Sequence, residues 1–339
     1  MLSYCEFLAM KKVNPSDDVY IENIVYDISA ANDYICQWNG YELDRIFNVK
    51  APNVHELFTN NQWNNIIADI KETKFWERNW NYPVLFTDAF RKQGLSLQNI
   101  RGDFESSGWP RMVKSEKEPM SQKIKNKLER FLPYIYLQLY LRKRRAANVF
   151  TDYSKDLFLT TDEDIFTGQR LTFKMKNSGI ENIEKEIRQT FVFPKIFDKK
   201  NMEMLSLIQS NESVAIHARR GDMLGYNYAF YVTGYFKRAV KYIRKHTARP
   251  VFFIFCDPDS VMWAKENETV LGLNMKKDEI YFIDWNKSTE SYRDMQLMAA
   301  CKHQVITNSS FGWWGAWLNT NPNKITCSPN SNINTTHSF

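Results

Sequence analysis

"SVAIHARRGDM", residues 213–223, joins an apolar run to a charged end within one short stretch. A continuous apolar run of this length is typical of a strand that is buried on both faces, as in a parallel sheet. Side chains alternate along a strand, so we expect Val214 and Ile216 on one face and His217 on the other. The two arginines that follow lie at the carboxyl end of the predicted strand, where parallel sheets bind their ligands.

The rest of the second half repeats this pattern of short apolar runs separated by helical stretches. The apolar runs lie at 250–256, 279–284, 303–307 and 324–328, and the helical stretches at about 233–247, 259–267, 289–302 and 312–319. Strands that alternate with helices predict a parallel sheet covered by helices. We therefore expect an α/β fold with a Rossmann-like domain in this half of the chain.

The first half has a less regular pattern that is rich in aromatic residues. Helical periods lie at about 1–12, 61–72 and 121–148, short strands are expected at 18–26 and 82–87, and the polar segment 105–126 is typical of a loop. A chain of 339 residues exceeds the usual size of a single core. We therefore predict two domains, residues 1–165 and 166–339.

The composition is that of a folded globular protein, with 43% hydrophobic and 25% charged residues. A net charge of +6 over this length disfavours a nucleic-acid partner, because such a partner requires a concentrated basic face. The five cysteines form no Cys-x-x-Cys pair, so free thiols in a reducing cytosol are expected. No apolar run reaches the roughly 20 residues that cross a bilayer, and we expect a cytoplasmic protein.

The segment "RFLPYIYLQLYLRKRR", residues 130–145, is the strongest candidate for a membrane contact. It is too short to span a bilayer, and Pro133 and Gln138 interrupt it. A buried helix with a basic C-terminal end is the simpler interpretation. The alternative is a surface segment that leans on anionic lipid, which would make the protein peripheral to the inner face of the membrane.

Arg219 and Arg220, at the end of the first predicted strand, favour an anion-binding site. A guanidinium group carries a planar fork of donors that matches the neighbouring oxygens of a pyrophosphate. Gly221 allows a sharp turn or the close approach of a ligand, and Asp222 could orient an arginine or accept a proton. Arg-Gly-Asp is also an adhesion motif, but adhesion requires an exposed loop, and a second copy at 101–103 has no strand before it.

A second polar cluster, Asn308, Ser309 and Ser310, follows the apolar run that begins at His303, which we expect to be a satisfied core residue. Hydroxyls and backbone N–H groups at a helix N-terminus bind anions. Plain N-capping by one of the serines is the alternative, and the tryptophans of the next helix are more typical of a core. The sequence shows no metal-binding pattern, since Asp257-Pro258-Asp259 is typical of a turn and an N-cap.

Four segments make the chain resemble glycosyltransferase family 11, the α-1,2-fucosyltransferases, in its bacterial form. "HARRGD" (217–222) and "DMQLMAACKHQVITNSSFGWWGAWL" (294–318) match the C-terminal blocks of that family. "CQWNGYELDRIFNV" (36–49) is similar to its "HNGFELxRIF" segment, and "VFFIFCDPDSVMWAKEN" (251–267) to its "FSDDxxW" block. The resemblance is collinear over about 36–320, with poor agreement at 50–165.

The resemblance implies a GT-B-like fold of two Rossmann-like domains. The N-terminal domain would be irregular, helix-rich and on the acceptor side, and the C-terminal domain would bind a GDP-sugar. It implies an inverting, metal-independent transfer of L-fucose from GDP-β-L-fucose, without a cofactor, to the 2-hydroxyl of a terminal galactose-type sugar on an oligosaccharide or glycolipid. A fucosyltransferase of another linkage, another GDP-sugar glycosyltransferase and a non-catalytic nucleotide-binding protein are the alternatives.

The resemblance also implies donor-binding residues, carried over position by position. These are His217 beside the nucleotide, Arg219 and Arg220 on the diphosphate, Asp294 on the guanine edge, and Asn308, Ser309 and Ser310, with the two serines on phosphate. Core α-1,6 relatives carry a glutamate base near the position of Asn227, and an amide cannot take a proton. Asp222 is therefore the candidate catalytic base, and a dissociative path would require less of it.

The sequence departs from the family at its start. The family opens with a Gly-rich "GGLGNQ" turn that leads into a helix, whereas this sequence begins inside that helix, at "MLSYCEFLAMKK". We therefore expect the N-terminal domain to be incomplete at its start. The family's "GYxQ" segment has only a faint counterpart here, "TGQR" at 167–170.

Overall fold

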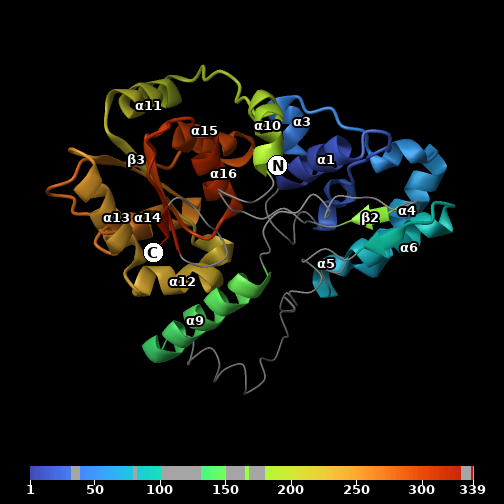
Figure 1. Cartoon of the computed structure of the whole chain (residues 1–339), viewed down its shortest axis with the longest axis horizontal. Helices are drawn as coiled ribbons and strands as arrows, with labels where there is room; N and C mark the ends of the chain where they lie inside the picture. Colours follow the sequence, from blue (N-terminus) through green and yellow to red (C-terminus); the bar gives the residue numbers. More distant parts are fainter. Residues whose placement is uncertain are drawn as a thin grey trace. The chain divides into compact units, whose positions relative to one another are not determined.

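The computed structural model describes residues 1–31, 39–78, 82–100, 131–149, 165–167, 180–329 and 337–338 (Figure 1). The chain divides into two compact units. The first comprises Met1–Pro119, Asp152–Thr172 and Asn177–Pro194, and the second comprises Met120–Thr151, Phe173–Lys176 and Lys195–Phe339.

The second unit is built on a six-stranded sheet in which every neighbouring pair is parallel. Its strands are β3 (Ser213–Ala218), β4 (Val251–Cys256), β5 (Ile280–Ile283), β6 (His303–Ile306), β7 (Thr326–Ser328) and β8 (His337–Ser338). All the strands predicted for this half of the sequence are present; β3, β4, β6 and β7 are buried almost throughout, and β5 is mostly half-buried. The predicted α/β class is thus confirmed.

Helices cover both faces of this sheet (Figure 1). They are α11 (Lys199–Ser210), α12 (Leu224–Val232), α13 (Tyr235–His246), α14 (Val261–Glu266), α15 (Tyr292–Ala300) and α16 (Ser310–Leu318), with the short 3-10 helices η5 (Gly221–Met223), η6 (Pro258–Ser260) and η7 (Ser288–Glu290). Val214 and Ile216 share a core with Phe236 and Val240 of α13. His217 points to the other face, toward α16, as the alternation along the strand predicted.

The order of the strands creates a switch point beside β3. The order is β5–β4–β3–β6–β7–β8, so the chain runs outward from β3 through β4 and β5 and then returns to β6 on the other side of β3. Connections leave β3 and β6 in opposite directions, which opens a crevice at their carboxyl ends. The residues after Ala218 and after Ile306 therefore occupy the usual ligand position of such a sheet.

Helix α9 (Leu132–Val149) contains most of the apolar segment that we expected to be a buried helix with a basic end. Ile135 is buried and Leu139 packs against the core of the second unit, but Tyr136 and Tyr140 are each 56% exposed. The expected helix is therefore present, but only one side of it is buried. Across the described residues, no helix has the length and apolarity required to cross a membrane.

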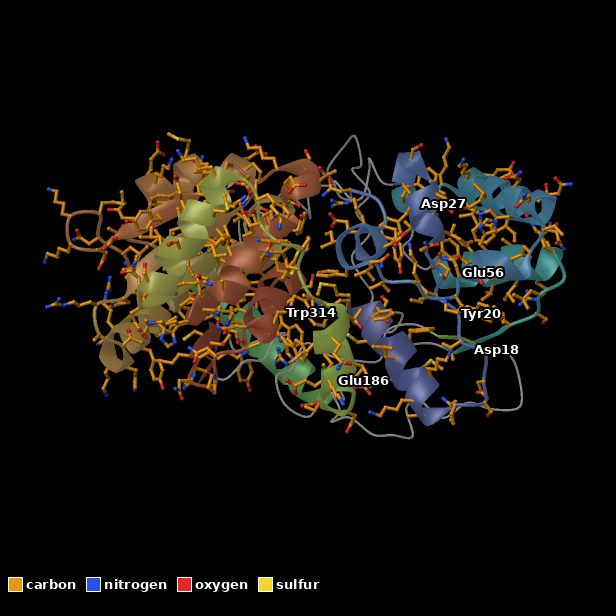
Figure 2. The ribbon with its side chains drawn as sticks, turned by 90° about the horizontal axis from the view of Figure 1, so that it is seen from above. Asp18, Tyr20, Asp27, Glu56, Glu186 and Trp314 are labelled. Carbon is orange, nitrogen blue, oxygen red and sulfur yellow. The ribbon has the colours of Figure 1, made fainter. Side chains whose placement is uncertain are left out.

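The first unit is helix-rich in its described residues. It contains α1 (Leu2–Val13), η1 (Ile24–Asp27), α3 (Glu42–Phe47), η2 (Val54–Leu57), α4 (Asn60–Thr73), α5 (Phe75–Arg78), α6 (Tyr82–Lys92), η4 (Ile180–Ile183) and α10 (Glu184–Thr190), and a parallel pair, β1 (Gln98–Ile100) with β2 (Ile165–Thr167). Glu186 of α10 accepts a hydrogen bond from Lys12 of α1 at 3.1 Å, which joins distant parts of the chain (Figure 2).

Two strand predictions in the first unit were wrong. Residues 82–87 begin helix α6, because the buried residues Phe86, Ala89 and Phe90 continue a helical period beyond the predicted strand. Residues 18–26 contribute only a single bridge, at Ile21, before the 3-10 helix η1 begins. The predicted helices at 1–12 and 61–72 are present as α1 and α4. The expected loop at 105–126 lies outside the described residues.

Candidate functional site

Thr307 ties together the two strand ends that border the crevice. It follows β6, and its hydroxyl donates to the carbonyl of His217 at 3.2 Å. The same oxygen accepts a hydrogen bond from the backbone N–H of Arg219 at 3.1 Å. Thr307 is fully buried, so this bridge holds the start of the arginine segment against the end of β6.

Asp257 anchors both arginines, a role that the sequence did not reveal. One carboxylate oxygen pairs with the guanidinium of Arg219, and the other accepts from the backbone N–H of Arg220 at 2.7 Å. Asp257 occupies the predicted N-cap position of η6, but its side chain makes no cap hydrogen bond there and contacts the arginine segment instead. A Cβ atom on Gly221 would lie 3.1 Å from Cγ of Asp257, so the carboxylate packs closely against a glycine. The sequence signals were its position directly after a predicted strand and its place in the segment that resembles the "FSDDxxW" block.

Arg220 is held by aromatic faces and keeps its donors free. Its guanidinium carbon lies 3.6 Å from the ring centre of Trp263 on α14 and 5.0 Å from that of Tyr231 on α12. No side chain or carbonyl among the described residues accepts a hydrogen bond from this guanidinium group. Burial lowers its pKa from the ordinary value, an effect that a bound anion would oppose. Arg220 is thus an oriented cation without an acceptor in the described structure.

His217 is a neutral group at this site. The side chain is 4% exposed, and Nδ1 has no hydrogen-bond partner among the described residues. Burial, with a smaller contribution from Arg219, lowers the pKa of His217 to about 3. The imidazole is therefore uncharged near neutral pH and offers a polar nitrogen rather than a cation. Its ring centre lies 5.6 Å from that of Phe311 on α16.

The N-terminus of α16 is open. Ser309 occupies the N-cap position but makes no side-chain cap hydrogen bond, so plain N-capping does not account for the serines. Neither Ser309 nor Ser310 has a hydroxyl hydrogen bond within the described structure. Asn308 is 9% exposed, and its Oδ1 is buried without a partner among the described residues. Free backbone N–H groups and hydroxyls at a helix start attract anions.

Asn227 holds the backbone of the arginine segment in place through a hydrogen bond to a carbonyl. Its side-chain amide donates to the carbonyl of Arg219 at 2.9 Å, and the hydroxyl of Tyr231 donates to the same carbonyl at 2.9 Å. Asn227 is fully buried, and its Oδ1 lacks a partner in the described residues. Asp222 lies on η5, but its side chain is outside the described structure, so its role as a base stays a prediction.

Asp294 lies on the first turn of α15 and is partly buried. Burial raises the pKa of its carboxyl group to about 7, opposed by a hydrogen bond from Asn286 and assisted by the charge of Asp284. Burial, followed by the charges of three carboxylates including Asp257 and Asp294, raises the pKa of Cys256 to about 12. The charge of Asp294 thus contributes to the raised pKa of Cys256, the last residue of β4, and this places Asp294 at the same edge of the sheet as the arginines.

Most of the predicted donor-binding residues thus meet at one edge of the sheet. His217, Arg219, Arg220, Asn308, Ser309 and Ser310 all lie at the adjacent carboxyl ends of β3 and β6. Three buried polar atoms without partners in the described residues belong to this region, on His217, Asn227 and Asn308. Buried polar atoms are normally hydrogen-bonded, so such a cluster indicates a candidate ligand-binding site.

Two other expectations concern residues outside this cluster. His303 is a satisfied core residue, since Nε2 lies 2.8 Å from Glu212 and Nδ1 accepts from the N–H of Ile325 at 3.0 Å. Trp313 and Trp314 are 0% and 3% exposed and belong to the core, as expected (Trp314 is labelled in Figure 2). No group of three or more potential metal ligands occurs in the part of the chain that the structure describes.

A parallel sheet with a switch point between two neighbouring strands is typical of Rossmann-like folds. Residues 180–336 match the sequence model of glycosyl transferase family 11. The matched range contains both strand ends and Asp294. The N-terminal segment 36–49, which also contributed to the resemblance, lies outside it.

Individual relatives support the family assignment. The chain is 33% identical over 132 residues to an α-1,2-colitosyltransferase of Escherichia coli, covering 38% of this chain and 43% of that protein. It is 31% identical over 128 residues to the O-antigen biosynthesis glycosyltransferase WbnK of Escherichia coli, covering 36% and 40%. It is 26% identical over 110 residues to galactoside α-(1,2)-fucosyltransferase 1 of Saimiri sciureus, covering 31% and 28%. The matches span less than half the length of these relatives, all of which are glycosyltransferases.

Proposed function

We propose that this chain is part of an inverting, metal-independent fucosyltransferase. It would transfer L-fucose from GDP-β-L-fucose to the 2-hydroxyl of a terminal galactose-type sugar on an oligosaccharide or glycolipid. The enzyme would have a GT-B-like architecture and act in the cytoplasm, with at most peripheral contact to the membrane. The observation that carries the proposal is the free guanidinium of Arg220 beside the start of α16, both without acceptors among the described residues and inside the range that the family model matches.

The diphosphate is the natural ligand for these donors. Arg220 presents a free guanidinium fork, and the start of α16 presents backbone N–H groups with the hydroxyls of Ser309 and Ser310. Such groups stabilise negative charge that grows on a leaving diphosphate when the bond to the sugar breaks. Arg219 contributes less directly, since its guanidinium is already paired with Asp257. In this proposal the arginine and the helix start supply the charge neutralisation.

The remaining residues have more specific roles in the proposal. Neutral His217 would contact the nucleotide through Nδ1, and Asn308 would contribute its buried amide oxygen. Asp294 would accept hydrogen bonds from the guanine edge. Asp222 would take the proton of the acceptor hydroxyl. A dissociative path, in which an oxocarbenium ion forms before deprotonation, lowers the demand on that base.

The relatives favour one alternative donor sugar. The α-1,2-colitosyltransferase is named for transfer of colitose rather than fucose. Another GDP-sugar, or fucose in another linkage, would use the same diphosphate site with a different sugar pocket. A non-catalytic nucleotide-binding protein would retain the site and lack transfer.

Transfer assays separate these possibilities. The protein is incubated with GDP-fucose and either lactose or N-acetyllactosamine, and the linkage of the product is determined by NMR. A 2-linked fucosyl product supports the proposal, and a fucosyl product of another linkage supports the second candidate. GDP binding without transfer or hydrolysis supports a nucleotide-binding protein, and the absence of GDP binding overturns the proposed site.

A further inference from the structure

A directed chain of side-chain hydrogen bonds ends at Asp294. The indole N–H of Trp285 donates to Oδ1 of Asn201 at 2.9 Å. Asn201 and Asn286 form a reciprocal amide pair, with Nδ2 of Asn201 on Oδ1 of Asn286 at 2.8 Å and the return bond at 3.1 Å. Nδ2 of Asn286 also donates to Oδ1 of Asp294 at 2.7 Å.

Trp285 and Asp198, which contact Asn201, determine the orientation of both amides in this hydrogen-bond series. Trp285 can only donate, so the atom of Asn201 that faces it must be the oxygen. Asp198 accepts from Nδ2 of Asn201 at 3.1 Å, which places the amide nitrogen on that side. Burial raises the pKa of Asp198, but hydrogen bonds from the backbone and side chain of Asn201 lower it overall, so this carboxylate is an acceptor. Asn286 must then turn its nitrogen toward Asp294.

The amide pair is also shielded from competing partners. Asn201 and Asn286 are 3% and 9% exposed. Asp198 caps α11 through the N–H of Asn201 at 2.8 Å, so the first amide belongs to a well-defined helix start. A buried amide that reversed its orientation would face Trp285 with a donor and lose the bond. The pair therefore presents one fixed donor to Asp294.

Only one carboxylate oxygen of Asp294, Oδ1, accepts a hydrogen bond from this amide series. Within the described structure, Asn286 is the one side chain that donates to the carboxyl group, and Oδ2 has no partner. The titratable groups that act on it are Asp284, after β5, and Cys256, at the end of β4. Neither is a cation, so the carboxylate has no counter-ion among the groups that the structure describes around it. It is suited to accept from a ligand that offers N–H groups.

We propose that the Asn201–Asn286 amide pair is a positioning device that orients Asp294 to accept the N–H groups of a guanine base. The inference rests on the proposed nucleotide site and adds residues that select the base. Guanine presents two neighbouring N–H donors on one edge, whereas uracil presents a single N–H. An acceptor that is held in one orientation discriminates between them, and a freely rotating carboxylate does so less well.

The pH dependence of base selection distinguishes positioning from a structural role. Above pH 7 the Asp294 carboxyl group is ionised and both oxygens accept; below pH 7 it becomes protonated, and one oxygen then presents an O–H donor to the base. Preference for GDP over UDP should therefore be full above about pH 8 and decline below pH 7. The ratio of the two dissociation constants cancels the titration of the phosphates, which both ligands share.

The test measures GDP and UDP binding by calorimetry between pH 5.5 and 9 for the wild type, Asn286→Asp and Asn286→Ala. Asn286→Asp keeps the shape, so it separates loss of the donor from loss of packing. Both variants should weaken GDP binding by about tenfold or more at pH 8, with little effect on UDP. Both should also move the midpoint of the pH dependence upward, because the hydrogen bond from Asn286 is what lowers the pKa of Asp294.

The control is Asn274→Ala, at an exposed residue of the same unit, which should bind both nucleotides like the wild type. Wild-type GDP selectivity with an unchanged pH midpoint in Asn286→Asp would overturn the positioning role and leave the nucleotide site intact. A lower melting temperature of Asn286→Asp with no change in GDP selectivity would likewise overturn the positioning role, because it would show a structural role only. Failure of the wild type to bind GDP would overturn the proposed function and this inference together.

Discussion

Replacing Arg220 by lysine tests the diphosphate site most directly. Lysine keeps the charge but loses the flat face that lies 3.6 Å from Trp263, worth about 1 kcal/mol. It also replaces a two-pronged contact by a single one, at roughly 1.5–3 kcal/mol for the lost bond. Arg220 is only partly buried, so water reduces both effects, and we expect a net loss of about 1.5–3 kcal/mol. GDP binding should weaken roughly 10- to 150-fold.

Calorimetry with GDP provides the measurement, and fucosyl transfer at saturating donor provides the second readout. Arg244→Lys is a matched control, because Arg244 lies in the same unit on α13 and pairs with Asp278 at 2.7 Å. The control should bind GDP as the wild type does. An Arg220→Lys variant that binds GDP within about twofold of the wild type and keeps a near-full transfer rate would refute the diphosphate assignment.

Three further substitutions probe the packing of the site. Gly312→Ala places a methyl group 2.5 Å from Nδ1 of His217, so the free energy of unfolding should fall by about 1–3 kcal/mol. Urea denaturation measures this change, and an unchanged urea midpoint would contradict the contact. Asp257→Asn turns an acceptor into a donor beside two N–H groups, so stability should fall by about 1–3 kcal/mol. The exposed Asp259→Asn should leave it unchanged, and equal effects would count against the anchor. Trp313→Ala empties a site that is 0% exposed and should cost about 3–5 kcal/mol, measured as a lower melting temperature; wild-type stability would show that the core assignment is wrong.

The strands of the second unit could be predicted because their signal is local. Each apolar run is short and continuous, and a segment buried on both faces needs that composition wherever it lies in the sheet. The run at 213–217 became β3, and the arginines after it emerged at its carboxyl end. In the first unit the same reasoning failed at 82–87, because a short apolar run fits a buried helix equally well.

Asp257 shows what local patterns cannot supply. It lies 38 positions after Arg219, and its neighbours along the chain favoured a turn. It reaches the arginines only because β3 and β4 pair in parallel with Ala218 opposite Cys256. The amide pair beside Asp294 likewise cannot be found from local sequence patterns, since Asn201 and Asn286 are 85 positions apart.

The sequence by itself determined strands β3 to β7, helices α13 to α16 and the chemical groups at the strand ends, whereas α11, α12 and β8 were not predicted. Composition and alternation are local properties, and each strand carries its own. The order of the strands was decided only by the tertiary structure, and with it the meeting of β3 and β6 at the switch point. Parallel pairing joins segments that are far apart in the chain, so it depends on how helices and strands pack together rather than on the preference of any one segment.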